Sequence, residues 1–180
     1  MPKRIAHATK QSQSALLIEV AWEVCNQVGG IYTVIRSKAP VMMQNWSGHF
    51  CMIGPYVNKN ILAELEPLED AADVFGLAAA NLRKRGYDVI YAEWLITGKP
   101  RVVLLNPNVI EEKVLHVLKY LLWKNHSIQT PDKNELIDQV IGFAYLTKLF
   151  IDELVKISGN DQRILAHFHE WMAGLPILDI

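Results

Sequence analysis

The side chains most able to do chemistry gather at the end of an apolar run late in the chain. The stretch Ile164-Leu165-Ala166-His167-Phe168-His169-Glu170-Trp171 passes from apolar residues to two histidines, a glutamate and a tryptophan. Polar side chains at the carboxyl end of a strand build the ligand sites of open α/β sheets. We therefore expect His169 to hold a polar ligand. Trp171 fits two roles equally, stacking on a sugar or packing in the core.

His167 and His169 stand two positions apart, so on a strand both side chains point to one face. This spacing also occurs among metal ligands, but a metal ion needs at least one more ligand. Glu170 would point to the other face of a continued strand, so no metal site is predicted. His167 is interpreted as a core histidine with a satisfied hydrogen bond.

A second candidate is the loop Val28-Gly29-Gly30, which lies between a predicted strand and a predicted helix. Glycines there let the backbone approach a ligand, and the helix amides then face an anion such as phosphate. A tight turn that only leads into the helix is the alternative. The spacing matches neither G-x-G-x-x-G nor a Walker loop, which disfavours NAD and P-loop sites. Just upstream, Glu19 stands inside an apolar strand and needs a partner if it is buried.

The elements that position these residues alternate between strands and helices, and the strands are continuously apolar. This pattern predicts an α/β fold with a mostly parallel, Rossmann-like sheet and helices on both faces. Strands are predicted at 15–21, 49–53, 88–95, 101–105 and 163–168. Helices are predicted at 31–43, 71–85, from 111, from 131 to 159, and from 171 to 180, with a surface loop at 64–73.

Composition limits the classes of function. The 180 residues are 51% hydrophobic and 21% charged with a net charge of −1, which is typical of one globular domain and gives no electrostatic case for nucleic acid. No apolar run approaches the ~18 residues of a membrane span, and no secretory signal is present. Cys25 and Cys51 lack metal-type spacing and indicate free thiols in a reducing cytoplasm. Residues 1–14 are predicted to be a mobile tail.

Two long motifs, in order, resemble a known family. The run from Glu19 to Pro40, EVAWEVCNQVGGIYTVIRSKAP, resembles the opening of eukaryotic-type glycogen synthases. Met52–Tyr56, then Trp94-Leu95-Ile96 with Gly98 and Pro100, and finally Ala166–Trp171 with Ala173-Gly174 continue the resemblance. It covers the chain from about Ala15 to Gly174.

The resemblance implies a glycosyltransferase of the GT-B arrangement, with two Rossmann-like domains facing across a cleft. Such enzymes move glucose from UDP-glucose, or ADP-glucose, to the non-reducing end of glycogen or another α-1,4-glucan, with retention and without a metal ion or other cofactor. It places Gly29 and Gly30 against the donor phosphates. His169, with Glu170 and Trp171, is placed at the donor sugar. Gln27 stands where the relatives carry Lys or Arg, so a neutral amide replaces a phosphate-facing cation.

By the same resemblance, residues 15–180 are an incomplete N-terminal domain, and the C-terminal domain with the catalytic groups is absent. We expect no catalytic residue in this chain and no turnover by it alone. The full-length protein is expected to be a cytoplasmic homo-oligomer that binds neither nucleic acid nor membrane. The alternative is a non-catalytic Rossmann-like domain that binds glucan or a partner protein.

Overall fold

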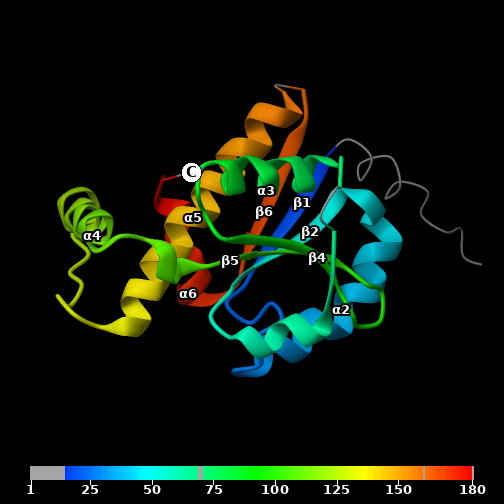
Figure 1. Cartoon of the computed structure of the whole chain (residues 1–180), viewed down its shortest axis with the longest axis horizontal. Coiled ribbons are helices and arrows are strands. Elements are labelled where there is room, and N and C mark those ends of the chain that lie inside the picture. Colours follow the sequence, from blue (N-terminus) through cyan, green and yellow to red (C-terminus); the bar gives the residue numbers. More distant parts are fainter. Residues whose placement is uncertain (1–14, 69–70, 160, 180) are drawn as a thin grey trace, which may run out of the picture.

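The computed structural model describes residues 15–68, 71–159 and 161–179, so the tail expected at 1–14 lies outside the described residues. Within them, six strands form one sheet in the order β3-β4-β5-β2-β1-β6 (Figure 1). The strands are β1 (Ala15–Val20), β2 (Phe50–Pro55), β3 (Leu65–Pro67), β4 (Val89–Trp94), β5 (Arg101–Leu105) and β6 (Arg163–Phe168).

Helices connect the strands and cover both faces of the sheet. They are α2 (Gly30–Trp46), α3 (Val74–Lys84), α4 (Glu112–His126), α5 (Glu135–Ser158) and α6 (Glu170–Gly174). Short 3₁₀ turns occupy Ser47–His49, Lys59–Glu64, Pro107–Val109 and Leu175–Asp179. None of the described helices is long and apolar enough to cross a membrane.

Alternation along the strands sorts the core into two layers. In β1, Ile18 and Val20 face the layer that contains α3 and α5, whereas Leu17 packs against the layer that contains α2. Figure 1 shows α3 and α5 on one side of the sheet and α2 on the other. Glu19, which alternates with Ile18 and Val20, therefore lies on the α2 side.

The half of the sheet formed by β5, β2, β1 and β6 is parallel. β1 pairs in parallel with both β2 and β6, and β2 pairs in parallel with β5. β4 pairs antiparallel with both β5 and β3, which gives the sheet an antiparallel edge. The predicted α/β class and mostly parallel sheet are confirmed.

Most predicted elements lie within a few residues of their observed bounds, and the last strand has the predicted bounds 163–168. The loop predicted at 64–73 is wrong in part, because Leu65–Pro67 forms β3. Its partner is β4, where Trp94 Nε1 also donates to Glu64 Oε2 at 3.1 Å. This pairing is a tertiary contact that a local pattern does not reveal.

Three helices differ from prediction. α5 begins at Glu135 rather than near Pro131, because the Asn134 side chain accepts from the Ile137 amide at 3.0 Å and caps the helix there. In α4 the predicted apolar stripe is mostly not buried, since Leu122 is its one buried residue among those described. Figure 1 shows the reason: α4 stands away from the sheet. The predicted helix at 171–180 is the short α6 followed by a 3₁₀ turn.

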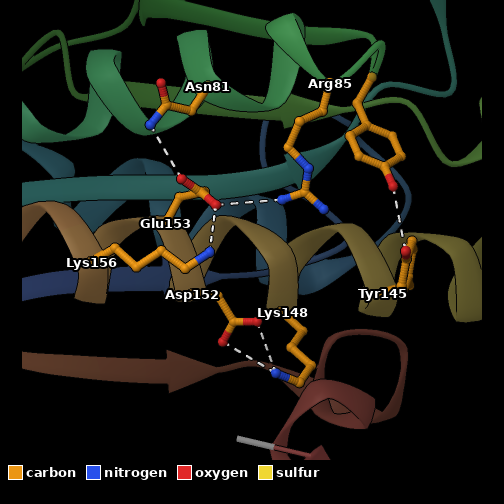
Figure 2. A network of polar contacts seen from close by, with 8 residues as sticks. Asn81, Arg85, Tyr145, Lys148, Asp152, Glu153 and Lys156 are labelled. Carbon is orange, nitrogen blue, oxygen red and sulfur yellow. Dashed lines mark hydrogen bonds and ion pairs between the residues drawn. The ribbon is translucent and has the colours of Figure 1, made fainter.

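A polar network fixes α3 against α5 on the face opposite α2 (Figure 2). Glu153 of α5 accepts hydrogen bonds from Asn81 at 3.2 Å, Arg85 at 3.4 Å and Lys156 at 2.8 Å. The bond from Lys156 is the largest influence, and although burial opposes it, the pKa of Glu153 falls below its usual value. The network orients the long helix that leads the chain to β6.

The turn between β4 and β5 makes a backbone contact with α2 that yields a stability prediction. Gly98 has φ +94°, and an added Cβ would lie 2.8 Å from Pro40 Cα. We expect Gly98→Ala to lower the free energy of unfolding by about 3 kcal/mol, from left-handed strain plus the clash. Gly86→Ala is the matched control, since Gly86 has φ +90° but open space around it, and should cost only about 1 kcal/mol. Urea denaturation measures the free energy of unfolding of both variants. Equal losses of stability would show that the backbone at Pro40 moves to accept the Cβ without cost.

Candidate functional site

The two motifs singled out in the sequence meet at one edge of the sheet. β1 leads through residues 21–29 into α2, and its parallel neighbour β6 leads through His169 into α6. The His169 amide donates to the Val20 carbonyl at 2.9 Å, which extends the contact beyond the strands. β2 lies on one side of β1 and β6 on the other, so the strand order reverses at this point. Ligands of open α/β sheets bind at such a reversal.

Glu23 organises the start of α2. This carboxylate is buried, and its Oε2 accepts from the Gly29 amide at 2.6 Å and the Tyr32 amide at 3.0 Å. Amides at a helix start attract negative charge, so Glu23 acts as a built-in anion for α2. A Cβ at Gly29 would lie 3.2 Å from Glu23 Oε1, which explains a small residue there.

The remaining amides of this turn are open. Within the described residues, the amides of Gly30 and Ile31 donate to no group. A Cβ at Gly30 would meet nothing within 4 Å, so space for a ligand lies directly over that residue. Gln27 is exposed in the loop just before. Two amides of the predicted anion site are therefore taken by the protein itself, and two are left.

Glu19 links α2 to the connection that follows β6. It is 1% exposed, and its Oε1 contacts Lys38 Nζ of α2 and His169 Nε2, the latter at 2.5 Å. Its sequence-based expectation of a partner is thus confirmed, with one partner on α2 and one after β6. Because Glu19 is an ionised acceptor, His169 is the donor in this hydrogen bond.

Electrostatics explain why that carboxylate stays charged. Burial raises the pKa of Glu19, but the hydrogen bond from His169 and the bond and charge of Lys38 outweigh it, so the pKa falls below its usual 4.5. His167 shows the opposite balance. Partial desolvation, followed by repulsion from His169 and Lys38, lowers the pKa of His167 despite the attraction of Glu19. This shift favours the neutral form of His167.

The other predicted residues of this connection, His167, Glu170 and Trp171, are all exposed. The interpretation of His167 as a core histidine is wrong: it is exposed and its ring lies 4.3 Å from that of His169. β6 is an edge strand of the described sheet, so no further strand covers that position. Trp171 is 58% exposed, which removes the core alternative. Glu170 begins α6, is exposed, and has φ +60°, a conformation costly for a residue with a Cβ.

The sequence reasoning missed two groups that matter here. It did not predict that Glu23 would accept from the amides at the start of α2. Lys38 was not singled out at all. The signal for Lys38 was its position on the helix directly after the strand that carries Glu19, and the contact is realised.

An apolar hollow of 360 Å³ lies elsewhere, between α4 and α5, and none of the candidate site residues lines it. Its lining includes Leu122, Ile141 and Leu175. Asn125, Tyr145 and Lys148 add polar groups to this lining, but neither predicted motif reaches it. The chemistry-bearing side chains and free amides lie at the β1–β6 edge, so that edge is the candidate site.

Comparison with known proteins gives consistent matches. The family described as glycogen synthase matches residues 19–179. The glycogen [starch] synthase of Neurospora crassa is 36% identical over 93% of this chain and 24% of its own length. The human liver enzyme is 35% identical over 92% of this chain and 23% of its own, and Saccharomyces cerevisiae isoform 1 is 32% identical over 92% and 24%. The chain spans about a quarter of the length of these relatives.

The Glu19 contacts generate a pH prediction. A carboxylate whose pKa is lowered by folding stabilises the fold above its unfolded pKa, and this contribution is lost as pH falls through the folded pKa. We expect Glu19→Gln to be about 2 kcal/mol less stable at pH 7, because Lys38 loses its partner. The gap should close as pH falls below the usual 4.5.

Urea denaturation of both proteins between pH 7 and pH 3 measures this gap. Glu66→Gln is the matched control, since Glu66 pairs with Lys99 with both side chains 59% exposed. It should change stability by less than about 0.5 kcal/mol at any pH. A Glu19→Gln gap that stays constant with pH would contradict the role of its charge.

Proposed function

This chain belongs to the glycogen synthase family, and on that premise we propose that the longer protein carrying it transfers glucose from a sugar nucleotide to an α-1,4-glucan. The acceptor is the non-reducing end of glycogen or a similar polymer, and the anomeric configuration is retained. UDP-glucose is the proposed donor, with ADP-glucose as the rival, because no group described at this edge selects the base. The reaction needs no metal ion or other cofactor. The protein works in the cytoplasm as a homo-oligomer.

One observation carries the proposal. Two motifs that resemble the donor site of this family come to the same edge, with Glu19 and His169 in contact although 150 positions apart. The open amides of Gly30 and Ile31 suit a phosphate, which gains from the positive end of α2. The exposed Trp171 and the fixed His169 lie on the adjacent connection, where the sugar would follow the phosphates.

In this proposal His169 orients the donor sugar. Its Nε2 is held by Glu19, so the ring is fixed before the sugar binds. A hydrogen bond between the ring Nδ1 and a sugar hydroxyl would position the anomeric carbon and strengthen as charge develops there. Glu19 and Lys38 act through His169 and are positioning residues. Gln27 contacts a phosphate oxygen without charge assistance, which weakens donor binding relative to Lys or Arg.

The catalytic groups that stabilise the leaving phosphate belong, in this proposal, to a second domain that faces this edge across a cleft. The chain of 180 residues alone should therefore give no turnover. Turnover by that chain would contradict the two-domain proposal.

The first test is glucose transfer to glycogen by the full-length natural protein, with UDP-glucose and ADP-glucose compared at equal concentration. We expect turnover, with UDP-glucose preferred, and loss of most of it in His169→Ala. His116→Ala, an exposed histidine on α4, is the matched control and should keep full activity. No turnover with either donor in a folded protein would overturn the proposal and favour a non-catalytic domain that binds glucan or a partner.

Gly30 offers a second test, because its substitution separates binding from stability. An added Cβ meets no heavy atom within 4 Å, so Gly30→Ala should leave the free energy of unfolding unchanged or about 0.5 kcal/mol higher. The same methyl group would occupy the space over the amides, so the KM for the sugar nucleotide should rise about tenfold. Gly48→Ala, whose Cβ would make only an ordinary 3.5 Å contact with Arg101, is the control. An unchanged KM in Gly30→Ala would place the phosphates elsewhere.

A further inference from the structure

Three potential metal ligands converge at the open side of the β1–β6 edge. Glu19 is the register partner of His167 in the neighbouring strand, and His169 follows two positions later on the same face. One carboxylate oxygen of Glu19 and one ring nitrogen from each histidine all lie within 4.8 Å of one another. The sequence pattern indicated both histidines as possible ligands, and it considered Glu170 as the third. The structure supplies it from β1 instead.

A second, independent observation points to a missing cation. Glu19 Oε2 is buried and has no hydrogen-bond partner among the described residues. Its sister atom Oε1 takes both Lys38 and His169. An ionised carboxylate oxygen removed from water without a partner carries a substantial penalty. A bound cation would remove that penalty.

The donor set identifies the kind of cation. Two imidazole nitrogens and one carboxylate oxygen suit Zn²⁺ and similar transition metals, whereas Mg²⁺ and Ca²⁺ prefer oxygen ligands. Ligands of a tetrahedral Zn²⁺ at about 2.0–2.1 Å lie roughly 3.4 Å apart, so the three atoms need only a small approach. His167 is exposed, so the ion can enter from solvent.

Lys38 sets the limit on affinity. Its ammonium group contacts Glu19 Oε1 and repels any cation bound to the same carboxylate. A doubly charged ion with two imidazole ligands competes against this repulsion, whereas a weakly held alkali ion does not.

We propose that Glu19, His167 and His169 bind one divalent transition-metal ion of the Zn²⁺ type, and that this ion competes with the sugar nucleotide for His169. The ion is an inhibitor and not a cofactor of the transfer. The competition rests on the proposed function, whereas the binding of the ion does not.

The binding is tested by isothermal titration of the untagged 180-residue chain with ZnCl₂, and with MgCl₂ for comparison. We expect one Zn²⁺ per chain and no Mg²⁺ binding. His167→Ala and Glu19→Gln should each weaken Zn²⁺ binding at least about tenfold. His116→Ala, the matched control on α4, should leave it unchanged. His167 is exposed, so its variant tests the site even if Glu19→Gln fails to fold. Equal Zn²⁺ binding by His167→Ala and the wild type would overturn the proposal.

The competition is tested in the full-length protein by the KM for the sugar nucleotide with and without Zn²⁺. We expect Zn²⁺ to raise KM, and His167→Ala to relieve this effect while leaving the rate without Zn²⁺ unchanged. Inhibition that persists in His167→Ala would overturn the competition. A protein that binds Zn²⁺ through His167 but transfers no glucose would contradict the proposed function and leave the proposed ion site intact. The two failures are therefore distinguishable.

Discussion

The need to neutralise a buried carboxylate governs this domain more than any other single constraint. Glu19 is buried near the carboxyl end of β1, one strand in from the β6 edge, where an unpaired charge would be strongly destabilising. Its partners come from two elements that contact β1: Lys38 comes from α2 on one face of the sheet, and His169 follows the neighbouring strand β6. The pairing therefore fixes both elements against β1 at the place where the strand order reverses. A purely apolar residue at position 19 would leave the orientation of His169 unspecified.

A second buried carboxylate, that of Glu23, orients backbone amides in the same way that Glu19 orients side chains. Glu23 holds the Gly29 and Tyr32 amides, so the first turn of α2 is set before any ligand arrives. The amides of Gly30 and Ile31 remain for an external anion, and their direction is fixed by the neighbours that Glu23 holds. In the proposed function, this preorganisation would lower the conformational cost of binding the anion. Glu19 thus orients the His169 side chain after β6, and Glu23 orients the backbone turn after β1.

Local sequence patterns predicted the parts of this arrangement that depend on local physics. The apolar run at 163–168 and the glycine after α5 predicted the last strand and the end of the long helix, because strand burial and a glycine cap are written in neighbouring residues. β3 was missed because three residues become a strand only through pairing with β4. For the site, the residue types at Gly29, Gly30 and His169 were visible in the sequence. The clamp by Glu23 and the pairing of Lys38 with Glu19 were not, because each depends on how a helix or loop folds back onto β1.

The charge distribution at this edge bears on how a donor would be held. A sugar nucleotide brings a strongly anionic diphosphate, yet Lys38 is already paired with Glu19, and Arg36 contacts the hydroxyl and ring of Tyr32. Gln27 adds an amide where a cation would help, and Glu23 and Glu170 add negative charge nearby. Free backbone amides and a helix terminus can orient the diphosphate but supply only partial charge. Under the proposed function, the full positive charge that balances the diphosphate would therefore have to come from outside this edge.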